Sequence, residues 1–193
     1  MFYQELSILP ACGMGVNHIW SKLYTQLHLA LATRMNAEGR EDGKGRIGVS
    51  FPDYNNNGEK KGLGRKLRIF AYDAEDLKRL DIAKWLRNYK DYVHIQAVLP
   101  VPPDTGYAVY RRVHHKSNRN RAMRYAKRHD MSYGEALNLF PKEISRDLPF
   151  VRLSSETNHN SYRLSIEKIQ QDAKVFAGFT SFGLDNHSTV PEF

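Results

Sequence analysis

A run of basic residues between Arg111 and His129 is the strongest chemical signal in this sequence. The run holds eight Lys or Arg residues, three His residues and no Asp or Glu. A solvated helix face normally mixes both signs, because unlike charges three or four residues apart stabilise each other. The run therefore predicts that a partner supplies the counter-charge, and a polyphosphate such as RNA or DNA is a partner of this kind.

The spacing within this run predicts an arginine-rich helix over about residues 118–128, which Ser117 or Asn118 can cap. Four cations fall within one arc of that helix: Arg121, Arg124, Lys127 and Arg128. The other side of the helix is expected to pack inward, and it carries three apolar residues: Ala122, Met123 and Ala126. The arc favours a face that binds phosphates over the alternative, an arginine-rich face without a specific partner.

His28 is the titratable side chain of most interest outside the basic run. It lies one helical step past Tyr24, at the edge of an apolar stripe, where an imidazole can face a core boundary or a cleft. The pattern alone favours a hydrogen-bonded boundary histidine. Ser154, Ser155 and Thr157 are ordinary loop residues by themselves, and the chain shows no Ser-His-Asp order or nucleophile elbow.

Composition excludes several classes of protein. The 193 residues are 41% hydrophobic and carry a formal charge of +8, which fits a folded protein with an anionic partner. Cys12 is the only cysteine, so an intramolecular disulfide and a paired-thiolate zinc site are both excluded. With no HExxH-like spacing either, we expect no metal and no cofactor. No apolar stretch approaches the ~20 residues that span a bilayer, and the first residues lack the charged segment of a signal peptide, so we expect a cytosolic protein that avoids membranes.

Hydrophobic periodicity in the first half predicts the order βαββαβ, the ferredoxin-like pattern of an α+β protein. Asn17 is a candidate N-cap of the first helix. The predicted strands cover residues 2–9, 47–51, 67–71 and 93–101, and the predicted helices begin near 17 and after 73. We assign residues 1–103 to this ferredoxin-like domain.

The segment PVPPDTG marks the predicted boundary to a smaller C-terminal domain, residues 104–193. This domain is expected to contain the arginine-rich helix, a second helix and β-strands. Ser132 and Glu135 have the spacing of a capping box at the start of that second helix. The expected strands cover residues 150–153, 162–169 and 176–184.

The chain resembles the type I-F (Ypest subtype) CRISPR repeat-processing endoribonucleases, which cleave precursor CRISPR RNA (crRNA) at the base of each repeat hairpin. Short segments carry the resemblance, in order, along nearly the whole chain: KLYTQLHLAL, RIGVSFPD, LGRKLRI, RRVHHKSN, KRHD, LPFVRLSS, NSYRL and FTSFGL, with an aromatic C-terminus. The resemblance implies a ferredoxin-like domain followed by a smaller domain that places its arginine-rich helix in the major groove of the RNA hairpin.

The resemblance also implies roles in RNA binding. Arg112 matches an arginine that makes a bidentate contact to the guanine beside the cut. His114 stands where the family usually has glutamine, so contact with the next base should differ. Tyr162 replaces a phenylalanine that stacks under the terminal base pair. The full expected RNA-binding set is Arg112, His114, Lys116, Arg119, Arg121, Arg124, Lys127, Arg128, His129 and Tyr162.

For catalysis, the resemblance implies metal-independent cutting by the ribose 2′-hydroxyl, which leaves a 2′,3′-cyclic phosphate and a 5′-hydroxyl. His28 matches the family's catalytic histidine, expected as general base. Ser155 matches the serine that orients the hydroxyl, with Ser154 and Thr157 as alternatives. Phe182 stands where the family has an active-site tyrosine. The implied partners are the crRNA hairpin, which stays bound, and other type I-F effector subunits.

Two other functions are compatible with the sequence. The loss of a hydroxyl at Phe182 favours a hairpin-binding subunit that no longer cleaves. A helix-turn-helix DNA-binding protein is the second alternative, built from helices at about 118–128 and 133–140. Against it, the arginines lie on the first of these helices, whereas that motif contacts bases through the second.

Overall fold

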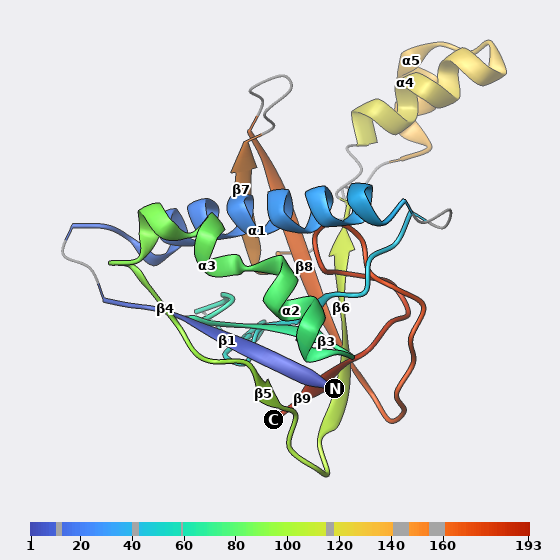
Figure 1. Cartoon of the computed structure of the whole chain (residues 1–193). Coiled ribbons are helices and arrows are strands. Elements are labelled where there is room, and N and C mark those ends of the chain that lie inside the picture. Colours follow the sequence, from blue (N-terminus) through green and yellow to red (C-terminus); the bar gives the residue numbers. More distant parts are fainter. Residues whose placement is uncertain (11–12, 40–42, 59, 115–117, 141–146, 155–160) are drawn as a thin grey trace. The chain divides into compact units, whose positions relative to one another are not determined.

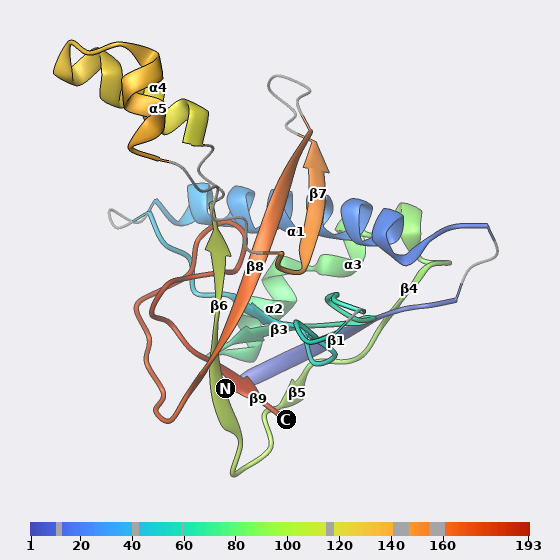
Figure 2. The same cartoon turned by 180° about the vertical axis from the view of Figure 1, so that it is seen from behind.

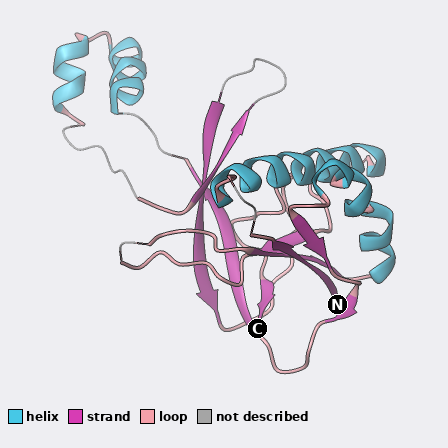
Figure 3. Cartoon of the chain, turned by 90° about the vertical axis from the view of Figure 1, so that its left-hand side faces the viewer, coloured by secondary structure: helices cyan, strands magenta, loops and turns pink. Residues whose placement is uncertain are grey.

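The computed structural model describes the chain except residues 11–12, 40–42, 59, 115–117, 141–146 and 155–160. It combines helices with antiparallel sheets, which confirms the α+β class (Figures 1 and 3). The contacts group the chain into two compact units. The larger unit consists of Met1–Arg112 and Leu148–Phe193, and the smaller unit is Val113–Asp147.

The first sheet of the larger unit has the strand order β2-β3-β1-β4, with the short β5 also paired to β1. All of its pairings are antiparallel. Its elements, with their helices, are β1 (Phe2–Ile8), α1 (Val16–Glu38), β2 (Gly48–Ser50), β3 (Lys66–Ala71), α2 (Ala74–Leu80), α3 (Ile82–Trp85), the 3-10 helix η1 (Arg87–Tyr89), β4 (Val93–Ile95) and β5 (Leu99–Pro100). The chain order through β4 is the predicted βαββαβ, although the strand expected over 93–101 is divided into β4 and β5.

The second sheet has the order β7-β8-β6-β9. Its strands are β6 (Gly106–Val113), β7 (Phe150–Ser154), β8 (Ser161–Gln171) and β9 (Val190–Glu192). The strand predicted over 176–184 is wrong: this segment forms turns and a single bridge, from Phe179 to Gly45. Gly178 and Gly183 adopt positive φ there, a conformation that bends the chain out of an extended strand.

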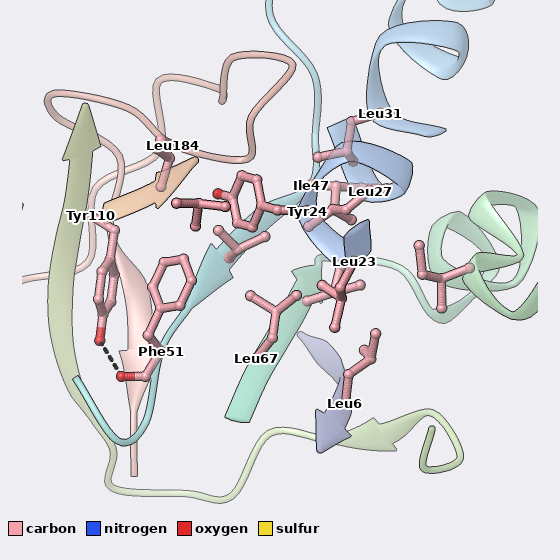
Figure 4. Packing of buried hydrophobic residues seen from close by; sticks show 14 of the residues in the cluster. Leu6, Leu23, Tyr24, Leu27, Leu31, Ile47, Phe51, Leu67, Tyr110 and Leu184 are labelled. Atoms are coloured by element: carbon pink, nitrogen blue, oxygen red, sulfur yellow. Dashed lines mark hydrogen bonds between the residues drawn. The ribbon is translucent and has the colours of Figure 1, made fainter. Parts of the chain in front are cut away.

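The buried core of the larger unit contains residues from both halves of the chain (Figure 4). The Tyr110 hydroxyl of β6 lies 2.7 Å from a Glu192 carboxylate oxygen and 3.2 Å from the Phe51 carbonyl oxygen, and these two acceptors share its single hydrogen. Leu153 and Leu164, on β7 and β8, are buried in the same cluster. The contacts therefore group β6 to β9 with the N-terminal elements, which differs from the boundary expected near residue 103. Packing of the second sheet against α1 and β2, which a local composition change does not reveal, causes this difference.

Helix α1 packs against β7 (Figures 1 and 2). The helix buries every residue of the predicted apolar stripe: Trp20, Leu23, Tyr24, Leu27 and Leu31. Ile19 and Ala30 of the same helix are also buried. The helix begins after Gly15, which forms no side-chain cap, so the cap predicted at Asn17 is wrong. None of the described helices is both long and apolar enough to cross a membrane.

The smaller unit contains α4 (Asn118–His129) and α5 (Tyr133–Asn138). The predicted capping box is confirmed: the Ser132 hydroxyl accepts from the Glu135 amide, and the Glu135 carboxylate accepts from the Ser132 amide. The buried residues of its small core are three alanines, Ala122, Ala126 and Ala136. Alanine side chains allow the two short helices to approach closely.

Candidate functional site

Two side chains of α1 hold consecutive carbonyl groups of a C-terminal loop. The Tyr24 hydroxyl donates to the Phe182 carbonyl at 2.8 Å, and His28 Nδ1 lies 2.9 Å from the Ser181 carbonyl oxygen. Because a carbonyl oxygen only accepts, Nδ1 of His28 carries a hydrogen. In the neutral ring the other nitrogen, Nε2, then has its lone pair available to accept a proton.

Tyr24 was not predicted as a site residue. Its side chain is fully buried, and burial raises the pKa of its hydroxyl well above the ordinary value, so the hydroxyl stays a neutral donor. The i, i+4 spacing of Tyr24 and His28 indicated a shared stripe on the helix. It carried no information about the loop that both residues contact.

The loop Thr180–Leu184 is a tight turn fixed to β2. The Gly183 amide donates to the Thr180 carbonyl at 2.8 Å, and the Thr180 amide donates to the Leu184 carbonyl at 2.9 Å. The Val49 amide of β2 donates to the Gly183 carbonyl at 3.0 Å. Gly183 has φ of +70°, and a Cβ atom there would lie 2.7 Å from Val49 Cγ1. A glycine is therefore needed where the loop approaches the sheet.

The ring of Phe182 lies in a stack with other predicted site residues. It is parallel to the His28 ring, with 4.1 Å between centroids and 5° between planes. The Arg112 guanidinium carbon lies 5.2 Å from the centre of the Phe182 ring and 5.5 Å from that of Tyr162. The structure thus brings together four residues that the sequence analysis singled out, and we call His28, Phe182, Arg112 and Tyr162 the stacked cluster.

The neighbouring residue of β6, Arg111, is engaged elsewhere. Its Nη2 atom lies 2.7 Å from a Glu167 carboxylate oxygen, and its Nε atom 2.8 Å from the same oxygen. Successive residues of a strand point to opposite faces of the sheet. This alternation separates Arg111 from the stacked cluster and leaves Arg112 as the strand's contribution to it.

The predicted active-site hydroxyl groups are only partly described. Ser154 is exposed at the end of β7, and Ser155 and Thr157 lie outside the described residues. Among the contacts that the structure describes, none joins Ser154 to His28. The choice between the three hydroxyl groups stays a prediction.

In the smaller unit, α4 presents its cations to solvent. Arg119, Arg124, Lys127, Arg128 and His129 are exposed, whereas Arg121 is half-buried with its guanidinium carbon 4.5 Å above the centre of the Phe140 ring. Ala122 and Ala126 pack inward as predicted, but Met123 is 60% exposed, so its predicted packing is wrong. Met123 lies too far around the helix from Ala122 to reach the narrow contact with α5.

Two further predicted RNA-binding residues are less informative. His114 is exposed and belongs to the smaller unit, and Lys116 lies outside the described residues. No group of three or more His, Cys, Asp or Glu side chains suited to hold a metal ion is found in the part of the chain that the structure describes.

Comparison with known proteins matches nearly the whole chain. A family model described as CRISPR-associated protein (Cas_Csy4) matches residues 3–193. The chain is 35% identical over 196 residues to the "CRISPR-associated endonuclease Cas6/Csy4" of Pseudomonas aeruginosa (strain UCBPP-PA14), covering 99% of this chain and 98% of that protein. It is 30% identical over 195 residues to the protein of the same name from Escherichia coli (strain UTI89 / UPEC), with the same coverage. The matched range includes all of the smaller unit, all but the first two residues of the larger unit, and every residue of the stacked cluster.

Proposed function

The chain belongs to the Cas_Csy4 family of CRISPR-associated proteins, and we propose that it is an endoribonuclease that cuts precursor crRNA at the base of the repeat hairpin. The endonuclease name of its relatives supports the general activity. The observation that carries the catalytic part of the proposal is the fixed imidazole of His28, whose Nδ1 donates to the Ser181 carbonyl.

In the proposed reaction, His28 Nε2 accepts the proton of the ribose 2′-hydroxyl beside the cut. The 2′-oxygen then forms a bond to the adjacent phosphorus, and the bond from phosphorus to the 5′-oxygen breaks. The departing 5′-oxygen takes a proton from water, so the products are a 2′,3′-cyclic phosphate and a 5′-hydroxyl. A positioned general base typically contributes ~10²–10⁴-fold to such a rate. The step as written uses no metal ion.

The proposed RNA contacts divide between the two units. Arg112 presents a guanidinium held over two aromatic rings, a geometry suited to a bidentate contact with guanine. Tyr162 offers a ring on which the terminal base pair can stack. The exposed cations of α4 neutralise phosphates of the hairpin. We further propose that the enzyme keeps its product and joins other type I-F effector subunits.

A second candidate is a subunit that binds the crRNA hairpin without cutting it. The observation that favours it is the side chain at position 182, which is phenylalanine where an active-site tyrosine is expected by resemblance. The parallel contact of Phe182 with His28 supports activity instead, because stacking needs only the ring.

The test uses a synthetic hairpin RNA of the CRISPR repeat from the same genome, incubated with the protein in EDTA. The wild type should give products with a 2′,3′-cyclic phosphate and a 5′-hydroxyl, and a single 2′-deoxy substitution at the cut should prevent cleavage. His28→Ala should abolish cutting but leave binding nearly unchanged. His18→Ala is the matched control, because His18 is exposed on the same helix.

The outcomes separate the two candidates. Binding without cutting by the wild type would support the non-cleaving subunit. Cutting that EDTA stops, or an active His28→Ala protein, would refute the proposed mechanism.

A further inference from the structure

The β7–β8 hairpin carries two arginines directly opposite each other. Arg152 of β7 pairs with Arg163 of β8 in the ladder, and both side chains are exposed. Opposed residues of an antiparallel ladder lie close enough for their side chains to interact, and like charges in this position destabilise the sheet. The fold therefore tolerates a repulsion that substitution of either residue would remove.

Neither arginine forms an ion pair with a carboxylate in the described part of the chain. Other exposed cations of this unit do so: Lys78 and Arg79 both lie within 4.0 Å of a Glu75 carboxylate oxygen, at 3.8 and 3.5 Å. The cations of α2 thus have a carboxylate partner within the protein, whereas Arg152 and Arg163 have none among the described residues. An anionic partner would remove the repulsion.

The surroundings of the two arginines fit a nucleic-acid strand. The Arg163 guanidinium carbon lies 3.6 Å above the centre of the Phe150 ring, so the ring holds its plane on one side. Ser154 and Ser161, opposite each other at the next positions of the same sheet face, are exposed hydroxyl groups. Phosphate contacts in nucleic-acid complexes come from this set of donors, and bases stack on guanidinium planes. We call Arg152, Ser161 and Arg163 the outer arginine patch.

The patch is distinct from the stacked cluster. Tyr162 is adjacent to Arg163 on β8, and successive strand residues point to opposite faces of the sheet. The guanidinium of Arg112 lies on the Tyr162 side. The strands β7 and β8 therefore carry Tyr162 of the stacked cluster on one face and the outer arginine patch on the other, with β7 as the edge strand of the sheet.

We propose that the outer arginine patch binds single-stranded RNA that continues from the repeat hairpin beyond its paired stem. This inference rests on the proposed function, since it assigns a second contact to the same substrate. Arg152 neutralises a phosphate, and Arg163 combines phosphate binding with stacking of an unpaired base on its exposed face. An acidic protein segment is the competing partner, which the polyglutamate measurement below distinguishes.

The test measures binding by the full-length protein of four RNA probes, and of polyglutamate as a fifth ligand, over a range of salt concentrations. The probes are the repeat hairpin made non-cleavable by a 2′-deoxy substitution at the cut, the same hairpin with an oligouridine tail at its 3′ end, the hairpin with the tail at its 5′ end, and oligouridine alone. Arg152→Gln/Arg163→Gln should lose the extra affinity that one of the tails provides. Its slope of log affinity against log salt for that probe should fall by roughly 1.4, from two contacts of about 0.7 each. Binding of the tail-less hairpin should not change.

Two further variants make the result specific. Lys78→Gln/Arg79→Gln removes the same charge from exposed cations that have a carboxylate partner, and it should bind every probe as the wild type does. Arg163→Lys keeps the charge and loses the planar stack, so it should keep the salt slope but lose part of the tail's affinity. Thermal unfolding of Arg152→Gln should not occur below that of the wild type, because the change removes a repulsion.

The outcomes are distinguishable. Equal tail affinity in the wild type and the double variant would overturn the proposal, and so would an equal loss for the tail-less hairpin. Tighter binding of polyglutamate than of oligouridine at this patch would overturn it in favour of an acidic protein. If no hairpin binds at all, the proposed function fails, and the effect of the double variant on oligouridine alone still decides whether the patch binds RNA.

Discussion

Two groups of cations in this protein are held in opposite ways. Arg112 extends from a strand of a large core, and its guanidinium lies over the rings of Phe182 and Tyr162. The cations of α4 stand on a helix whose buried contacts are alanines, and most of them are exposed. A guanidinium already held in place loses little freedom on binding, which favours recognition of one base. Exposed cations adapt to many phosphates and contribute affinity that depends on salt.

Neutralising the α4 cations tests the second half of this comparison and has the largest expected effect. Arg124→Gln/Lys127→Gln/Arg128→Gln should weaken binding to all repeat hairpins, because three phosphate contacts are lost. The slope of log affinity against log salt should fall by about 0.7 to 0.9 per contact. Met123→Gln is the control, an exposed position of the same helix without charge. A triple variant that cuts more slowly at saturating RNA, with normal binding, would contradict the assignment.

Arg112→Lys tests the first half, since it keeps the charge and removes the planar fork. We expect loss of ~1–3 kcal/mol of discrimination between guanine and adenine beside the cut, with little change in the salt slope. Competition binding with hairpins that differ only in that base measures the effect. If discrimination survives and the salt slope falls instead, Arg112 acts like the α4 cations and the two groups are not different.

The sequence predicted the elements whose hydrophobic pattern is local. The alternation in β1 and β3 and the stripe of α1 are patterns of this kind, and each matches the structure closely. Strands β6 and β9 were missed for identifiable reasons. β6 ends in Arg111 and Arg112, whose charges were interpreted as the start of the basic region, and β9 has Pro191 at its centre.

In the candidate site, too, the sequence indicated some of the residues, whereas the contacts between distant segments became visible only in the fold. The types and order of His28, Arg112, Tyr162 and Phe182 pointed to the site through resemblance, and the structure brings them together. The hydrogen bonds of the loop to α1 join residues more than 150 positions apart, such as Tyr24 and Phe182, 158 apart. No periodicity in one chain indicates such a contact, so the role of Tyr24 required the fold.

Tyr24→Phe tests whether this anchoring matters for the stacked cluster. The change removes one hydrogen bond to the Phe182 carbonyl and should destabilise the protein by about 0.5–1.5 kcal/mol. If the loop also aims the imidazole of His28, single-turnover cleavage should slow while RNA affinity stays unchanged. Tyr54→Phe is the matched control, because the Tyr54 hydroxyl donates to the Ile166 carbonyl at 3.0 Å. A similar loss of cleavage in both variants would show that only stability was affected.

The smallest expected effect concerns Asp185, which follows the anchored loop. Burial acts to raise the pKa of this carboxyl, but hydrogen bonds from Lys44 Nζ and from the Ser188 and His187 amides outweigh it and hold the pKa below the ordinary value of 3.8. The carboxylate therefore stabilises the fold above that value, and this contribution is lost as pH falls through the lower, folded pKa. Asp185→Asn should unfold at lower temperature than the wild type at neutral pH, and the difference should shrink in acid. A difference that stays constant down to acidic pH would mean that the shape of the side chain, and not its charge, fixes this part of the loop.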